Sequence, residues 1–203
     1  MSGADDGGSG MSDQEINSVT QLLTIPIPDR AFADTRVIFE NRFMSLYGAP
    51  VDFGDFRKEY FVTRYKKSVQ VLVVDDDKVL LTAQYRYLID GISLEIPGGC
   101  CDDEESLEDA ARRECLEETG IWCEHLEPFF RSRAGEDTLD TDTSVYYCDR
   151  PTPKTEFVPK KSEVLGIGWV PFDDCLSAIR TGEIVNLCTV AAVLRYRMFV
   201  KPD

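Results

Sequence analysis

The chain has 203 residues, of which 43% are hydrophobic and 10% aromatic, so it can build the core of a globular domain. It carries 22 Lys and Arg residues against 37 Asp and Glu residues, which gives a formal net charge of −15. This balance argues against non-specific binding to nucleic acids or anionic membranes, because both need clustered basic residues.

The first part of the chain predicts a tail followed by strands. Residues 1–18 are rich in Gly, Ser and Asp, and we expect them to form a disordered tail. Apolar patterns at 36–47 and 60–62 predict strands, so we expect residues 19–66 to form an N-terminal β extension. Aromatic side chains in such strands usually pack in a core, although stacking on a nucleotide base is the alternative. We expect core positions for Phe43, Tyr60 and Phe61.

Residues 67–203 predict a second domain in which strands and helices are mixed. Ser68 to Val74 and Lys78 to Gln84 read as the strands of a hairpin around 75–77, and Leu94 to Gly99 as a strand ending in a glycine-rich turn. A helix is expected from Leu107 to Glu118, with a cap at Ser106 and an end at Gly120. Further strands are expected at 129–131, 145–147 and 165–170, and further helices at 172–180 and 186–199. This order predicts an α/β fold, a mixed sheet with helices on its faces.

Three carboxylates share one face of the helix expected at 107–118. Glu114, Glu117 and Glu118 are three and four residues apart, and they fall on the face that carries small apolar residues. Desolvated carboxylates repel one another, and a hard divalent cation such as Mg²⁺ would remove that cost. A solvated acidic face is the alternative for an isolated Glu run. The preceding Gly98–Gly99 favours the metal site, because glycine lets the backbone approach a ligand closely.

The segment from Gly99 to Ile121 resembles the Nudix box, G-x5-E-x7-R-E-U-x-E-E-x-G-U, in which U is a bulky aliphatic residue. Cys115 stands at one aliphatic position, and this departure concerns core volume rather than chemistry. The fixed positions are all filled, by Gly99, Glu105, Arg113, Glu114, Glu117, Glu118 and Gly120.

The resemblance implies the Nudix α/β/α sandwich and an enzyme that hydrolyses a nucleoside diphosphate linked to another group, using Mg²⁺ or Mn²⁺. It implies metal ligands at the three glutamates of the helix and at the carbonyl of Gly98. Glu105 and Arg113 are implied to hold the loop and helix together through an ion pair, with Gly99 and Gly120 as structural positions of the motif.

The flanking residues resemble the branch of ADP-ribose and nucleotide-sugar pyrophosphatases. Gln84-Tyr85-Arg86 and Leu94–Gly99 resemble two motifs of that branch, with Gly98 in place of its usual Ala. The likeness implies a substrate-binding role for Arg86 and Glu95, and a weaker one for Arg64. It also implies a base outside the box that activates water. We expect this base to be Glu163, with Glu136 and Asp137 as alternatives.

These resemblances predict hydrolysis of ADP-ribose to AMP and ribose 5-phosphate. The alternatives are another diphosphate substrate, such as GDP-mannose, a dinucleotide or an oxidised nucleoside triphosphate, or a non-catalytic nucleotide-binding module. The N-terminal extension resembles the one through which relatives dimerise, so we expect a homodimer. We expect a small-molecule partner, but no nucleic acid and no membrane.

The cysteines and the lone histidine exclude several kinds of site. Seven cysteines without zinc-site spacing, and no signal-peptide pattern or membrane-length apolar run, lead us to expect reduced thiols in a cytoplasmic protein. His125 is the only histidine, which excludes mechanisms that need two, and we expect it to be an exposed polar residue.

Overall fold

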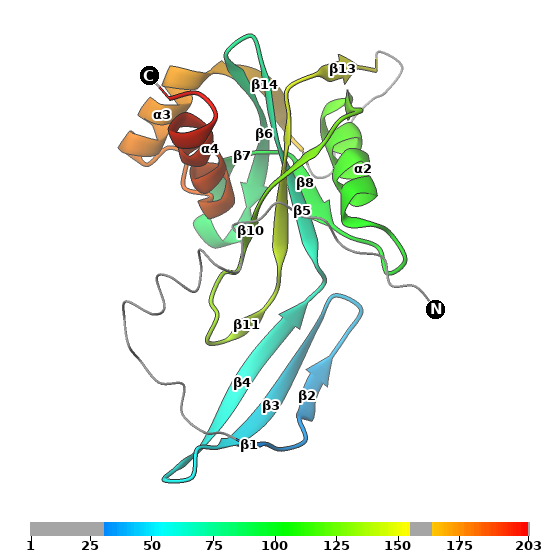
Figure 1. The fold of residues 1–203 in the computed structure, drawn as a ribbon, viewed down its shortest axis with the longest axis vertical. Coiled ribbons are helices and arrows are strands. Elements are labelled where there is room, and N and C mark those ends of the chain that lie inside the picture. Colours follow the sequence, from blue (N-terminus) through cyan, green and yellow to red (C-terminus); the bar gives the residue numbers. More distant parts are fainter. Residues whose placement is uncertain (1–30, 155–163, 203) are drawn as a thin grey trace. The chain divides into compact units, whose positions relative to one another are not determined.

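The computed structural model describes residues 31–154 and 164–202 (Figure 1). The expected tail at 1–18 and the expected base Glu163 lie outside these residues. The chain divides into two compact units. The first takes the chain up to Lys66 together with Arg133–Asp142, and the second takes Lys67–Ser132 and Thr143–Asp203.

The described part of the first unit is one twisted sheet. Its centre is an antiparallel hairpin in which Met44 pairs with Tyr65 at one end and Asp52 with Arg57 at the other. The strands are β1 (Ala31–Phe32), β2 (Arg36–Glu40), β3 (Met44–Asp52), β4 (Arg57–Tyr65) and β11 (Leu139–Asp140). They follow the order β1-β3-β4-β11, β2 also pairs with β3, and β11 runs parallel to β4.

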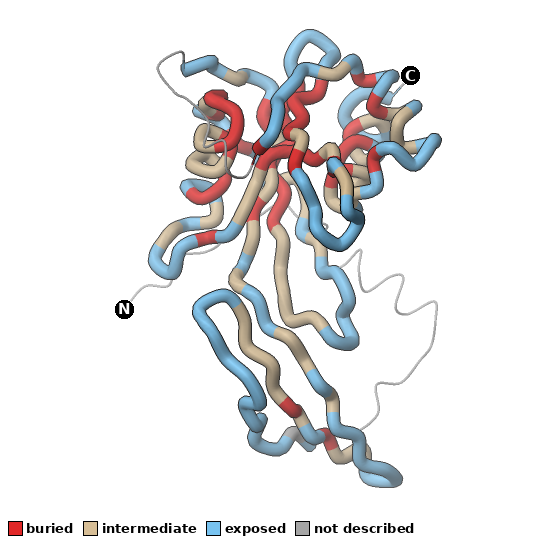
Figure 2. Tube along the Cα trace, turned by 180° about the vertical axis from the view of Figure 1, so that it is seen from behind, coloured by how far each residue is buried: buried red, intermediate tan, exposed pale blue. Residues whose placement is uncertain are grey.

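The aromatic side chains of this sheet are more exposed than the sequence predicted. Phe43 is 63% exposed and Phe61 is 53% exposed, so the expectation that they belong to a core is wrong for this chain. The reason is that the described part of the first unit has no helix and no second sheet to cover them, and much of its trace is exposed in Figure 2. Tyr60 is half-buried, and the Lys58 ammonium lies 4.1 Å from the centre of its ring.

The second unit is built around a mixed seven-stranded sheet in the order β10-β12-β5-β6-β14, with β7 beside β6 and β8 beside β5. Its central hairpin turns at Asp76 and Asp77, both at positive φ, as a two-residue hairpin turn requires. The strands are β5 (Ser68–Asp75), β6 (Lys78–Arg86), β7 (Gly91–Glu95), β8 (Gly98–Cys100), β10 (Glu127–Ser132), β12 (Thr143–Cys148) and β14 (Gly166–Pro171). A short 3-10 helix at Tyr87–Ile89 joins β6 to β7, and β9 (Ile121–Cys123) pairs separately with β13 (Pro151–Pro153).

Helices cover both faces of this sheet (Figure 1). Because side chains alternate along a strand, Val69, Val71 and Val73 of β5 pack in the core beneath α2 (Leu107–Thr119). Leu72 and Val74 face the opposite core, which includes residues of α3 (Phe172–Thr181) and α4 (Leu187–Phe199). The predicted α/β fold with a mixed sheet is thereby confirmed.

Local sequence signals predicted the ends of α2 correctly, but the prediction of a turn at Gly98–Gly99 was wrong. The Ser106 hydroxyl accepts a hydrogen bond from the Asp109 backbone N–H, and Gly120 ends the helix at φ 73°, both as expected. Gly98 and Gly99, expected in a turn, lie instead in β8, where they pair with Gln70 and Val69 of β5. The two strands approach so closely that only glycine fits at position 98, since a Cβ there would lie 2.1 Å from the Val69 carbonyl oxygen.

All seven cysteines are free thiols, and Cys100 is the exposed one. No helix among the described residues has both the length and the apolar character needed to cross a membrane.

Candidate active site

The centre of the site is the carboxylate of Glu118, near the C-terminal end of α2. The side chain is only 7% exposed. Its Oε2 accepts a hydrogen bond of 2.9 Å from the Gly98 backbone N–H, and its Oε1 accepts one of 3.0 Å from Nε2 of Gln84. The helix, β8 and β6 therefore meet at this carboxylate.

The environment of Glu118 disfavours its negative charge. Burial, together with the nearby charge of Glu114, raises the pKa of its carboxyl to about 7. The hydrogen bonds from Gly98 and Gln84 and the charge of Arg86 act in the opposite direction without cancelling the effect of burial. A positive charge placed here would restore the ionised form.

Glu114 lies one helical turn before Glu118 and against the same glycine pair. A Cβ on Gly99 would come within 2.6 Å of the Glu114 carboxylate, so β8 and α2 are in direct contact there. Oε1 of Glu114 accepts a hydrogen bond of 2.8 Å from Arg113. Glu117 is more exposed, with an oxygen 3.8 Å from the same guanidinium. The structure thus brings Glu114, Glu118 and the Gly98–Gly99 backbone together.

Arg113 braces the loop that leads into α2. It donates two hydrogen bonds, of 2.9 and 2.8 Å, to the two oxygens of Glu105, which is the ion pair expected from the sequence. It also donates to the Cys100 backbone carbonyl at 3.0 Å. The Glu105 hydrogen bonds raise the pKa of Arg113, while the Arg113 hydrogen bonds hold the pKa of Glu105 below its ordinary value. This network ties the end of β8 to the middle of the helix.

Arg86 and Glu95 form a second ion pair on neighbouring strands. Arg86 on β6 donates through Nε and Nη2 to the two oxygens of Glu95 on β7, both at 2.7 Å. Burial raises the pKa of Glu95, but its hydrogen bonds to Arg86 and Ser93 and the charge of Arg86 outweigh burial, so the pKa is lowered. Glu95 is buried, whereas about half of the Arg86 side chain remains exposed, 47% in all. Arg86 therefore has an open side toward solvent.

The remaining predicted residues belong to the other unit or lie outside the described residues. Arg64 is in the first unit, where its Nε donates to Asp140 at 2.6 Å and its guanidinium lies over the Tyr47 ring. Glu136 and Asp137 are exposed in the 133–142 segment of the same unit. The structure does not describe Glu163.

The residues around Glu118 fit a hard divalent cation. Among the described residues, no three His, Cys, Asp or Glu side chains are grouped so that they alone could hold a metal ion. Mg²⁺ does not need such a group, because it is usually bound by one or two carboxylates, waters and substrate phosphates. Glu114 and Glu118 supply two carboxylates of this kind, and the pKa of Glu118 is raised. They lie against Gly98 and Gly99, where a Cβ would take up the space between strand and helix.

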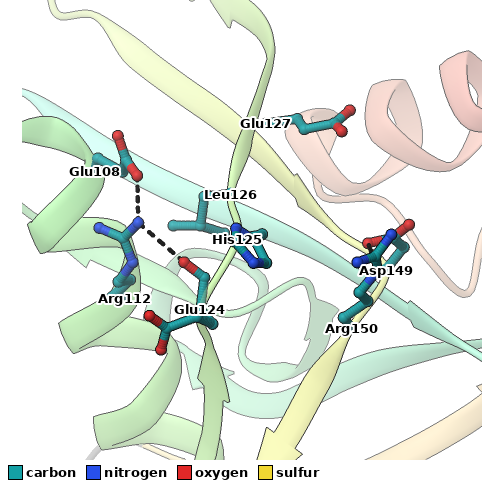
Figure 3. Close-up of a pocket in the computed structure, with 8 residues that line it drawn as sticks. All are labelled: Glu108, Arg112, Glu124, His125, Leu126, Glu127, Asp149 and Arg150. Carbon is teal, nitrogen blue, oxygen red and sulfur yellow. Dashed lines mark hydrogen bonds and ion pairs between the residues drawn. The ribbon is translucent and has the colours of Figure 1, made fainter.

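A separate cavity of about 360 Å³ lies beside α2 and contains none of the predicted site residues (Figure 3). Arg112 lines it, but the guanidinium is already engaged by Glu108 and by the Glu124 backbone carbonyl. His125 lies in the same cavity and is exposed, as the sequence predicted. We assign no role to this cavity.

Sequence reasoning missed the contribution of Gln84. The motif that contains this residue does not predict its hydrogen bond to Glu118. The available signal was its position two residues before Arg86, which places both side chains on the same face of β6. Nothing in the sequence showed that this face meets the end of α2.

Comparisons with known proteins show which family and fold the chain resembles. A family model described as the NUDIX domain matches residues 64–187. The CMP-5'-(N-acetyl-N-hydroxy-3-aminopropyl)phosphonate hydrolase of Streptomyces rubellomurinus is 25% identical over 167 residues, 78% of each chain. The ADP-ribose pyrophosphatase of Bacillus subtilis is 26% identical over 166 residues, 77% of this chain and 86% of the relative. A crystal structure of an ADP compounds hydrolase matches with a TM-score of 0.76 at 16% identity, over 88% of this chain and 97% of that one.

Proposed function

The chain belongs to the Nudix family of hydrolases, and from that membership we propose that it hydrolyses the pyrophosphate bond of a nucleoside diphosphate sugar. The substrate we propose is ADP-ribose, which would be split by water into AMP and ribose 5-phosphate. The observation that carries the proposal is the buried Glu118 carboxylate, held with Glu114 against the Gly98–Gly99 backbone. The likeness to an ADP-ribose pyrophosphatase supports this choice of substrate.

We propose Mg²⁺ or Mn²⁺ as the cofactor, held by Glu114, Glu117, Glu118 and the Gly98 carbonyl. When bound, the metal would neutralise charge on the pyrophosphate oxygens and lower the pKa of a coordinated water. The residues of the chain hold the proposed metal ligands in place. Gln84 and the Gly98 N–H fix the Glu118 carboxylate, and Arg113 holds both Glu114 and the preceding loop.

Substrate binding is assigned to cationic side chains. Arg86 keeps its guanidinium oriented through Glu95 while one side stays exposed, which suits a contact with a phosphate oxygen. Arg64 is proposed as a second contact, oriented by Asp140 in its own unit. Glu163 remains our proposed base for the attacking water, with Glu136 and Asp137 as alternatives.

A second candidate substrate class is suggested by the similarity to the Streptomyces rubellomurinus hydrolase. Its name gives a CMP-linked phosphonate as substrate, at an identity close to that of the ADP-ribose pyrophosphatase. A cytidine nucleotide linked to a phosphate or phosphonate group is therefore the alternative to ADP-ribose. The reaction, attack of water at phosphorus next to a nucleotide, would be of the same type.

The test is a substrate panel assayed with Mg²⁺, with Mn²⁺ and with chelator. The panel holds ADP-ribose, a CMP-linked phosphonate, GDP-mannose, a dinucleotide and an oxidised nucleoside triphosphate, and the products are separated by chromatography. We expect metal-dependent release of AMP from ADP-ribose at the highest kcat/KM. If no compound is hydrolysed with either metal, the proposal is wrong and a nucleotide-binding module becomes the better account.

We also propose that the protein is a cytoplasmic homodimer. The support is an apolar face on the sheet of the first unit. Phe39, Leu46 and Thr63 are cross-strand neighbours, and Phe61 and Tyr65 lie two residues from Thr63, so all five point to one face. Phe39, Phe61 and Tyr65 are each about half exposed. Exposed apolar patches of this kind are typical of protein interfaces.

A further inference from the structure

Gln84 is a buried side chain whose amide has a defined orientation. It is 5% exposed, and Nε2 lies 3.3 Å from Oγ1 of Thr82 and 3.0 Å from Oε1 of Glu118. The Thr82 hydroxyl donates its single proton to the Glu95 backbone carbonyl at 3.1 Å, because a carbonyl can only accept. Thr82 must then accept from Gln84, so the NH₂ group of Gln84, and not its oxygen, faces both partners.

This orientation determines how Glu118 is held. The two N–H bonds of the Gln84 amide go to Thr82 and to Glu118 Oε1, while the Gly98 N–H goes to Oε2. Each oxygen of the carboxylate therefore receives one donor from a rigid element, β6 or β8. A carboxylate has about four lone-pair positions, so one on each oxygen remains for a cation.

A neutral donor is the suitable partner at this place. A Lys or Arg at position 84 would neutralise Glu118 and compete with a metal, whereas an apolar side chain would leave Oε1 without its buried donor. Gln84 does neither, since it orients the carboxylate and leaves its charge intact. The relay runs from the Glu95 backbone through Thr82 and Gln84 to Glu118.

We propose that Gln84 is a positioning residue for metal binding, which acts by holding the Glu118 carboxylate in the orientation that binds the cation. This inference rests on the proposed function, since it takes Glu118 as a metal ligand. It assigns Gln84 no contact with the substrate. Thr82 supports Gln84 and has a weaker effect of the same kind.

The experiment is Mn²⁺ binding to the full chain without substrate, followed by electron paramagnetic resonance. Gln84→Met keeps the length of the side chain and removes both donors. We expect it to raise the Kd for Mn²⁺ by about 10- to 100-fold, the usual effect of losing a group that orients a metal ligand. Thr82→Val is expected to raise the Kd less, and Glu118→Gln to raise it most.

Activity gives a second readout that a merely structural role would not move. For Gln84→Met, the concentration of Mn²⁺ needed for half-maximal rate should rise, while kcat at saturating Mn²⁺ and the KM for the nucleotide recover to near wild-type values. Ser106→Ala is the matched control. It removes the cap of the same helix, so it lowers stability but should leave the Kd within about twofold of wild type.

The outcomes are distinguishable. If folded Gln84→Met binds Mn²⁺ as tightly as wild type, the role of Gln84 is wrong while the proposed function stands. Should that variant not fold, an unchanged Kd in Thr82→Val overturns the role and a raised one supports it. A wild-type protein that binds Mn²⁺ but hydrolyses nothing removes the proposed reaction alone, and one that binds no Mn²⁺ overturns both proposals.

Discussion

Two adjacent glycines lack a side chain for different reasons. At Gly98 a Cβ would lie 2.1 Å from the Val69 carbonyl oxygen and 2.7 Å from the Gln70 Cα, which are backbone atoms of the paired strand. At Gly99 the clash would be with the Glu114 carboxylate at 2.6 Å, the end of a flexible side chain. Gly98 is therefore required for the pairing of β5 with β8. Gly99 leaves room for the carboxylate of Glu114, one of the proposed metal ligands.

We predict that Gly98→Ala and Gly99→Ala separate stability from activity. Gly98→Ala should lower the free energy of unfolding by about 2 kcal/mol or more, because β5 and β8 have to move apart. Gly99→Ala should stay folded but lose most metal-dependent activity, because Glu114 is displaced. Urea denaturation and kcat measured on both variants check this. Equal loss of stability in the two variants would contradict the assignment.

The raised pKa of Glu118 gives a pH-dependent stability in the absence of metal. The folded pKa is about 7 against an ordinary value of 4.5, so between these pH values the folded protein holds a proton that the unfolded chain has released. Raising the pH through this window therefore favours unfolding, by an amount on the order of 3 kcal/mol.

We predict that Glu118→Gln removes this pH dependence, because an amide carries no charge to bury. With chelator present, the variant should gain stability relative to wild type on going from about pH 5 to about pH 8.5. Urea denaturation at the two pH values measures the change. If the difference in unfolding free energy between variant and wild type is the same at both pH values, Glu118 has an ordinary pKa and the prediction is wrong.

At the scale of elements, α2 meets the sheet through small side chains. Cys115 is fully buried, and its Sγ lies 3.8 Å from that of Cys123 on β9. Ala110 and Ala111 are also fully buried in the same core. This close approach brings the helix near enough for Glu118 to reach Gly98. Cys115, which stands where the Nudix motif has a bulky aliphatic residue, therefore packs in a narrow space between α2 and the strands beneath it.

We predict that Cys115→Leu, which restores a bulky aliphatic residue, destabilises the protein. Overpacking of a dense core typically costs about 1–3 kcal/mol. Cys100→Leu is the control, because Cys100 is exposed and its replacement should change stability by less than about 0.5 kcal/mol. Denaturant unfolding of both variants is the measurement. A Cys115→Leu variant as stable as wild type would mean that the core under α2 has room to spare.

The same elements show what the sequence could predict. The bounds of α2 follow from local signals at Ser106 and Gly120, and both were found. The spacing of Glu114 and Glu118 predicted that they share a face. The strand at Gly98–Cys100 and the pair of β9 with β13 were not foreseen, because cross-strand pairing depends on residues far away in the chain. The contact of Gln84 with Glu118, 34 residues apart, was hidden for the same reason.

At the scale of the molecule, the apolar face of the first unit is the proposed dimer surface. We predict that Phe61→Glu shifts the protein from dimer to monomer in sedimentation velocity, because a buried unpaired carboxylate is costly at an interface. Phe56→Glu is the control, since Phe56 is as exposed but lies at the turn between β3 and β4 rather than on the sheet face. A wild-type monomer, or an undisturbed dimer in Phe61→Glu, would contradict this surface.

The net charge of −15 has a local meaning in this fold. Glu114, Glu117 and Glu118 lie on one helix, and Glu118 is buried, so part of the negative charge is held where an anionic substrate would be repelled. The proposed divalent cation would reverse that local field and join the acidic helix to the phosphates. The proposed activity therefore requires the metal and the glutamates together.

The most direct test measures the products formed from ADP-ribose by wild type and by Glu118→Gln at saturating Mg²⁺. The account predicts AMP and ribose 5-phosphate in equal amounts from wild type, no products when chelator replaces Mg²⁺, and a kcat lower by about 100-fold or more in the variant. Turnover that survives chelation, or a Glu118→Gln variant with kcat within a few fold of wild type, would contradict it.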